Sequence, residues 1–212
     1  MADPILTSSA DYADALLTAR KARSSLILLL LIVILFQLGL FFAGRYKIQL
    51  DGDSGWLDEL KYLVGLSEFL GVVLAIVLAA TLWLIVMIML LGRVLGVSHL
   101  VSAFVASLVL AVLLFPWQAF LMNQSFSSDQ FRVPGVLYSW AELLMRVRVH
   151  PEGPQLQLLY WARFVGWPIV ALVIVLKIHL DSSKGLGAGL KGTGVKSTAP
   201  MVTIRQPPGT IV

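Results

Sequence analysis

Three long runs of apolar side chains dominate the chain, at residues 25–44, 69–91 and 100–117. A helix needs about 20 apolar residues to cross the roughly 30 Å hydrocarbon core of a bilayer. The first run follows basic residues, as the core of a signal peptide would, but no small-residue cleavage site comes after it. We therefore interpret all three runs as membrane-spanning helices that remain in the mature protein.

A fourth run, residues 158–180, is less continuous because it contains Arg163 and Lys177. Both side chains are long enough to carry their charge to the membrane surface while their stems stay in the apolar region. Pro168 lies inside the run and is expected to kink the helix. Four spans are predicted, with three as the alternative.

Two segments between the spans show apolar residues at helical spacing with polar residues opposite them. One follows the first span and the other follows the third, so both belong to the outer face. Helices of this kind lie flat in the membrane interface, where they either dock a partner protein or cover the bundle's own core. Their apolar faces contain Trp56 and Leu60 in the first segment and Leu137, Trp140 and Leu144 in the second.

Small residues recur at every fourth position in the second and third spans. Such spacing lets two helix backbones approach closely inside a membrane. Because the turn between these spans is short, we predict an antiparallel hairpin packed along the small residues; packing against another subunit and chance recurrence are the alternatives. The residues are Ser67, Gly71, Ala75 and Ala79 in the second span and Ala103, Ser107 and Ala111 in the third.

The predicted membrane domain, residues 25–181, lies between two different terminal segments. Residues 1–24 are expected to form a helix on the cytoplasmic side that runs into the first span, and residues 182–212, rich in Gly, Ser and Lys, a flexible tail. The basic residues before the first span and in the tail favour the inner side of the membrane. We therefore expect a multi-pass protein of the cell membrane with both termini in the cytoplasm.

The composition agrees with this interpretation and excludes several kinds of site. Apolar residues make up 58% of the chain and charged residues only 13%, with a mean hydropathy of +0.86. The net charge of +4 comes from basic residues at the ends of the apolar runs, which favours lipid headgroups over nucleic acid. The chain has no cysteine, which excludes disulfides, iron–sulfur clusters and thiolate metal sites.

Histidines are the main candidates for cofactor chemistry. His99 begins the third span and His179 ends the fourth, so the predicted topology places both at the inner surface. Histidines on facing helices can hold haem b, and a metal shared with Asp181 is a further possibility. Against a ligand role, His99 continues the small-residue face of its span, where it is expected to pack against a neighbouring helix. We expect no cofactor, with haem b as the alternative.

The sequence predicts an all-α integral membrane protein, a four-helix transmembrane bundle with two interfacial helices on its outer face. It contains no chain of ionisable residues through the bilayer and no recognisable enzyme motif. The leading hypothesis is a non-enzymatic structural or accessory subunit whose partners are lipid and other membrane subunits, or copies of itself. One alternative is a channel or small-solute transporter with Gln37, Ser107 and His99 along its route. The other is a haem-carrying electron-transfer subunit.

Overall fold

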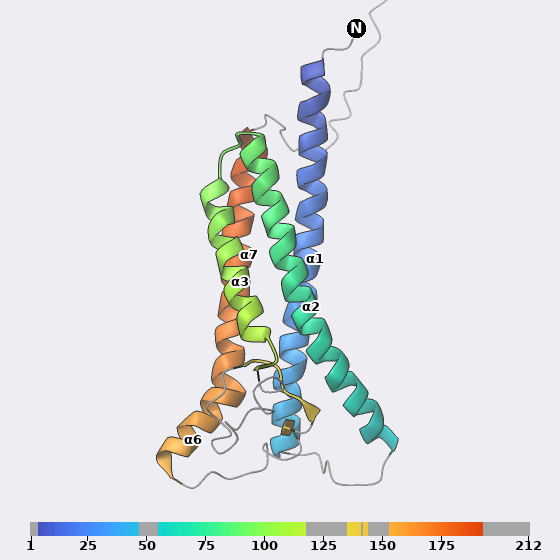
Figure 1. Ribbon diagram of the computed structural model, residues 1–212, viewed down its shortest axis with the longest axis vertical. Helices are drawn as coiled ribbons and strands as arrows, with labels where there is room; N and C mark the ends of the chain where they lie inside the picture. The colour runs from blue at the N-terminus through green and yellow to red at the C-terminus, as the bar shows by residue number, and fades with distance from the viewer. Residues whose placement is uncertain (1–3, 47–54, 118–134, 141, 144–152, 193–212) are drawn as a thin grey trace, which may run out of the picture.

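The structure is a computed structural model that describes residues 4–46, 55–117, 135–140, 142–143 and 153–192. All regular secondary structure in these residues is helical (Figure 1). The helices in chain order are α1 (Pro4–Tyr46), α2 (Gly55–Leu91), α3 (Val97–Leu114), α6 (Pro154–Trp161), the π-helical turn η1 (Ala162–Gly166) and α7 (Trp167–Gly192).

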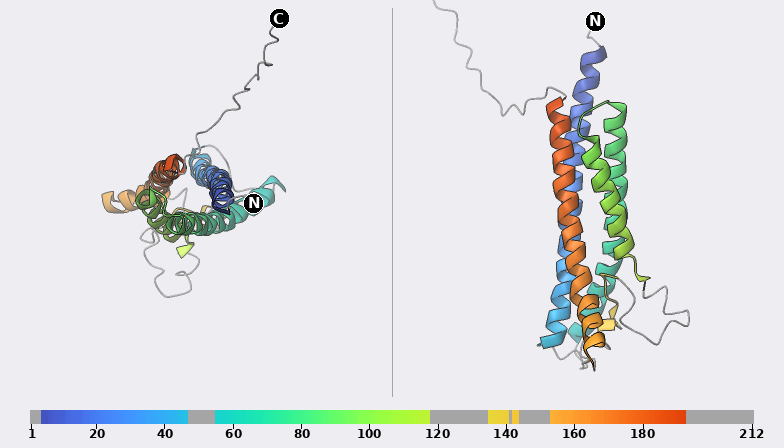
Figure 2. Two further views of the ribbon diagram at one scale, coloured as in Figure 1. Left: turned by 90° about the horizontal axis from the view of Figure 1, so that it is seen from above. Right: turned by 90° about the vertical axis from the view of Figure 1, so that its left-hand side faces the viewer.

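The four long helices run alternately up and down and form a closed ring (Figures 1 and 2). Each helix packs against two neighbours, in the order α1, α2, α3, α7 and back to α1. The start of α1, the turn between α2 and α3 and the end of α7 share one end of the bundle, which we call the near end. The segment 135–143 and α6 lie at the opposite end, the far end.

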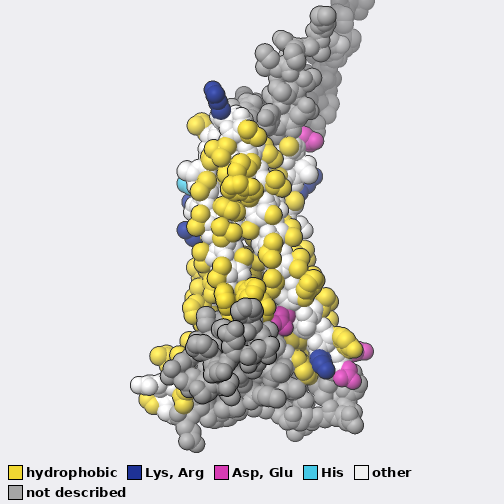
Figure 3. Space-filling view, in the orientation of Figure 1, with side chains coloured by type: hydrophobic (Ala, Val, Ile, Leu, Met, Phe, Trp, Pro, Cys, Tyr) yellow, Lys and Arg dark blue, Asp and Glu magenta, His cyan; other side chains and the backbone are white. Residues whose placement is uncertain are grey.

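Four helices are long and apolar enough to cross a membrane: Asp14–Arg45, Asp58–Leu91, Val97–Leu114 and Pro154–Leu190. In each helix, between 28% and 39% of the most apolar stretch is buried inside the protein. Most side chains of these stretches therefore face outward. Apolar atoms accordingly cover most of the described surface in Figure 3. The prediction of four helices long and apolar enough to span a membrane is confirmed, including the weaker fourth.

The first predicted interfacial segment does not form a separate helix. Residues 55–63 are the first turns of α2, which continues without interruption to Leu91. Neither proline nor a turn separates the two parts, and Val64 and Ser67 are buried where the helix meets the bundle. Leu60 is half-buried and packs against a cluster of buried residues that includes Phe41 and Val64. The side chain of Trp56 lies outside the described residues.

The second predicted interfacial segment also differs from the expectation. Residues 135–139 are not helical, and Leu137 is buried inside the bundle instead of facing an interface. A helical turn begins only at Trp140, which is half-buried, with the hydroxyl of Ser139 accepting the N–H of Glu142. The backbone of this segment bonds to side chains of the bundle, as described below, which agrees with its lack of helix. Leu144 lies outside the described residues.

The predicted start of the flexible tail, residue 182, is wrong. Helix α7 continues past residue 181 to Gly192, and Ser182, Gly185 and Leu186 are buried against the other helices. Small side chains here allow the backbone of α7 to pack closely on its neighbours, so the low apolar content of this stretch did not prevent helix formation. Residues 193–212 of the expected tail lie outside the described residues.

Candidate functional site

A buried arginine organises the far end of the bundle. Arg163, on η1, is 1% exposed and forms an ion pair with Glu142, which is equally buried. Its Nε donates to one carboxylate oxygen at 3.1 Å and one terminal nitrogen donates to the other at 3.0 Å. The same guanidinium also donates to the carbonyl oxygens of Gly135 and Leu137. The two-pronged geometry toward the carboxylate is the strongest arrangement for such a pair.

The π-helical turn that carries Arg163 is explained by Pro168. Proline has no backbone N–H, so the carbonyl of Phe164, four residues earlier, loses its normal helical donor. The hydroxyl of Tyr138 donates to this carbonyl instead, while the N–H of Trp167 reaches back five residues to the carbonyl of Ala162. The disturbance expected at Pro168 is thus present as a widened turn directly before it, where such turns often carry functional or structurally special residues.

Aromatic rings enclose the ion pair. The ring of Phe41 on α1 stacks on that of Phe164, with 4.9 Å between the centroids. The Arg163 guanidinium lies over the Tyr138 ring at 5.3 Å from its centroid, a cation–π contact that strengthens when water is excluded. Burial raises the pKa of Tyr138 although the nearby Arg163 opposes this shift. The phenol therefore stays protonated and remains a hydrogen-bond donor.

The polar contacts extend from the ion pair to α1 and α2. The side-chain oxygen of Gln37 accepts the backbone N–H of Tyr138 at 3.3 Å, and its nitrogen donates to the hydroxyl of Ser67 at 2.7 Å. Ser67 in turn donates to the carbonyl of Val64 at 2.8 Å. Gln37 and Ser67 are both buried. One connected set of hydrogen bonds therefore joins α1, α2, the segment 135–143 and the start of the fourth span.

This far-end cluster (Gln37, Ser67, Tyr138, Glu142 and Arg163) satisfies its own polar groups. In the described part of the chain, the only buried side-chain nitrogen or oxygen without a partner is Nε of Arg23, at the other end of the bundle. No group of three or more histidine or acidic side chains suited to a metal ion occurs among the described residues. The arrangement holds four parts of the fold together and presents no free nucleophile or base.

Two of the small residues predicted along α2, Ser67 and Gly71, lie against parts of the protein other than α3. Ser67 bonds to Gln37 of α1, and a Cβ atom on Gly71 would lie 2.8 Å from a methyl carbon of Leu137 and 3.4 Å from Val33 of α1. These two positions therefore face α1 and the segment 135–143. Ala75 and Ala79 are also buried.

On α3, Ala103 and Ser107 are buried and Ala111 is half-buried. Close packing of backbones is seen where α7 meets the start of α3. A Cβ atom on Gly185 would lie 2.9 Å from Cγ of Leu100 and 3.0 Å from the carbonyl oxygen of Gly96. The four-residue spacing of Gly185 and Gly189 is the signal that sequence reasoning missed, because these glycines were assigned to a linker.

The two candidate cofactor ligands do not converge. His99 is exposed, so the expectation that it packs against a neighbouring helix is wrong: Leu100 and Ala103 fill the inner face of α3 instead. His179 is half-buried in a groove between α1 and α7 that His99 does not line. Asp181 accepts a hydrogen bond from Ser102 at 3.0 Å. The two histidines in the described part of the chain, His99 and His179, therefore do not line a common groove.

The polar residues of the channel hypothesis are engaged in local bonds. Gln37 belongs to the far-end cluster, and the hydroxyl of Ser107 donates to the carbonyl of Phe104 within α3 at 2.6 Å. Neither residue lines the grooves that the structure describes. Their geometry is that of helix-packing residues.

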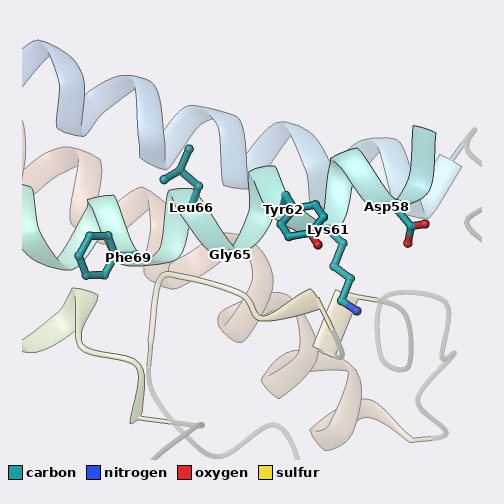
Figure 4. Close-up of a pocket in the computed structure, with 6 residues that line it drawn as sticks. All are labelled: Asp58, Lys61, Tyr62, Gly65, Leu66 and Phe69. Atoms are coloured by element: carbon teal, nitrogen blue, oxygen red, sulfur yellow. The ribbon is translucent and has the colours of Figure 1, made fainter. Parts of the chain in front are cut away.

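An exposed face on the first half of α2 is the second candidate site. Figure 4 shows six residues of this helix that line a surface groove: Asp58, Lys61, Tyr62, Gly65, Leu66 and Phe69. Their spacing places them along one side of the helix. Tyr62 is 79% and Phe69 65% exposed, and no described atom lies within 4 Å of where a Cβ of Gly65 would be. We call this surface the α2 face.

No family model, curated protein or solved structure matches this chain.

Proposed function

We propose that this protein is a non-enzymatic, multi-pass protein of the cell membrane that serves as a structural or accessory subunit of a larger membrane complex. Its partners would be the lipid bilayer and other membrane subunits, or further copies of itself. The observation that carries the proposal is the α2 face, because it combines large exposed apolar side chains with a glycine at its centre.

The α2 face has the features of a helix-docking surface. Exposed apolar side chains on a span can face lipid, but a small residue among them also lets a second helix approach closely. Tyr62 and Phe69 offer wide rings, while Gly65 between them leaves room for the backbone of a partner helix to approach closely. Asp58 and Lys61, one turn away, supply charges that can fix the register of a partner.

The far-end cluster supports a structural role. Its buried ion pair and hydrogen bonds join α1, α2, the segment 135–143 and the fourth span, so the far end is fixed in one arrangement. Buried polar groups that are fully satisfied make a region rigid and specify one arrangement. A rigid far end would hold the α2 face in position for a partner.

Gentle extraction from the native membrane followed by mass measurement tests the proposal. We expect particles larger than the 23.2 kDa chain with its lipid and detergent, and a defined stoichiometry. Gly65→Leu should dissociate them, because the new side chain occupies the space for a partner backbone. Gly39→Leu on α1 is the matched control, since Gly39 is likewise exposed with no atom within 4 Å of its Cβ position. A wild-type protein that runs as a lone monomer would contradict the proposal.

A further inference from the structure

A long apolar groove runs along the outside of the bundle between α1 and α7. It has a volume of about 520 Å³, within the range of pockets that hold small molecules. Its walls are aliphatic over most of their length, with Leu31 and Leu35 on α1 and Leu172 and Leu176 on α7. Where the groove approaches the near end of the bundle, its lining changes to Ser24 and His179.

The length of the groove matches one leaflet of a bilayer. Its lining on α1 extends from Ser24 to Leu35, eleven helical steps that cover about 16 Å at 1.5 Å per residue. The hydrocarbon core is roughly 30 Å thick, so the groove covers about half of it. An acyl chain of one leaflet would therefore lie along the groove with its polar end at Ser24 and His179.

The polar end of the groove is positively charged. Arg23, 2% exposed, donates from its terminal nitrogens to Ser182 Oγ at 2.8 Å and Ser183 Oγ at 3.2 Å, and so bridges α1 and α7 just beyond the groove. Its Nε is buried without a hydrogen-bond partner. Among the described residues, no carboxylate pairs with this guanidinium. A buried charge without a counter-charge is unfavourable unless an anion lies nearby.

Two further cations continue the groove on the same side of α1. Arg20 and Lys21 precede Ser24 by four and three residues, which places them one helical turn beyond it on the same face. Both are exposed. Together with Arg23 they form a cationic cluster at the depth where a lipid phosphate would lie if the chain fills the groove.

We propose that this groove binds one anionic phospholipid, with an acyl chain along the leucines, the headgroup phosphate against Ser24 and His179, and the exposed Arg20 and Lys21 as the cations that attract it. Charge complementarity favours lipid over a second copy of the chain, because a neighbouring helix would have to present acidic groups at this depth. Basic residues at the membrane surface attract anionic lipids in the same way. The inference is independent of the α2 face and of any partner subunit.

Native mass spectrometry of the full chain, released from nanodiscs with equal phosphatidylglycerol and phosphatidylcholine, tests this site. We expect wild-type protein to retain one phosphatidylglycerol in preference to phosphatidylcholine. Arg20→Gln/Lys21→Gln should lower this retention about tenfold, because two cations at the headgroup are lost. Leu31→Trp should lower it comparably by filling the groove.

Matched controls separate the groove from general effects. Arg93→Asn/Lys177→Gln removes the same charge from exposed positions that do not line the groove, and Ile32→Trp adds the same ring at a neighbouring exposed position that does not line it. Both should retain the lipid as wild type does. The proposal is overturned if wild type shows no preference for phosphatidylglycerol, or if controls and groove variants lose lipid equally. A dimer that Leu31→Trp dissociates, with no lipid retained, would assign the groove to a second copy and also overturn it.

Discussion

Arg163 is a charged residue whose burial depends on acceptors from a distant part of the chain. Its guanidinium donates hydrogen bonds to a carboxylate and to two carbonyl oxygens of the segment 135–143. From sequence alone it resembled a residue at the end of a span that reaches the membrane surface. The position of its partners 21 to 28 residues earlier carries no periodic signal, so this part of the site could not be predicted.

We predict that Arg163→Gln lowers the free energy of unfolding by about 3–5 kcal/mol, because the buried Glu142 carboxylate loses its ion pair with the guanidinium. Thermal unfolding in detergent, followed by near-UV circular dichroism, measures the loss. The double variant Glu142→Leu/Arg163→Met should recover part of it, since no unpaired charge remains. Full recovery is not expected, because the carbonyls of Gly135 and Leu137 still lose their donor. A loss below about 1 kcal/mol for the single variant would show that the pair is open to water.

Tyr138→Phe is predicted to destabilise the protein by about 1–2 kcal/mol, because it removes the donor to the carbonyl of Phe164. The size of this effect should depend on Pro168, because proline lacks the N–H that normally bonds to the carbonyl four residues earlier in a helix. In a Pro168→Ala background the new N–H can serve as donor, and the loss caused by Tyr138→Phe should shrink. A double-mutant cycle on unfolding free energies measures this coupling. Equal losses in both backgrounds would show that the two residues act independently.

The last part of helix α7 has the composition of a linker but forms a closely packed helix. Apolar length and periodicity were sufficient to predict the four spans, because a membrane imposes that length on any crossing helix. Beyond residue 181, glycine and serine dominate, and such composition is typical of linkers. The same residues here allow close packing on α3, which depends on a neighbouring surface and is not visible in one segment's sequence.

At this contact, Gly185→Ala should destabilise the protein. The added methyl group would meet Leu100 Cγ at 2.9 Å and the Gly96 carbonyl oxygen at 3.0 Å, and overpacking of this kind costs about 1–3 kcal/mol. Gly187→Ala, two residues away with no atom within 4 Å, should instead stabilise by up to about 1 kcal/mol through helix propensity. Paired thermal melts compare the two. The same sign of change for both variants would contradict the packing of α7 on α3.

The two expected interfacial helices show where the residue pattern was ambiguous. An apolar stripe at helical spacing predicts which side of a helix is buried, but it does not determine whether that helix is separate or continuous with a span. An apolar stripe also cannot exclude a segment without helix. Residues 135–139 are an example, because their backbone bonds to the side chains of Arg163 and Gln37. Side chains that are distant in sequence override the local preference here.

At the scale of the whole molecule, the up-and-down ring predicts that the near and far ends lie on opposite sides of a membrane. The chain has no cysteine, so single cysteines can report each side. Ser98→Cys marks the near end and Gln155→Cys the far end, and both positions are exposed. In intact cells an impermeant maleimide should label only Gln155→Cys, and Ser98→Cys should react after permeabilisation. Labelling of both from one side would contradict a four-span arrangement.

The far-end cluster also imposes an order on synthesis. Arg163 leaves the ribosome after α1, α2, α3 and the segment 135–143, and its span is the least apolar of the four, with a hydropathy of 1.9 against 3.0 for the first two. Until Arg163 is in place, Glu142 and the carbonyls of Gly135 and Leu137 lack their hydrogen bonds to its guanidinium. In the membrane-spanning arrangement that we propose, insertion of the last span and folding of the far end thus become a single event, and a nascent chain stalled before it would expose an unfinished surface for quality-control proteases to recognise.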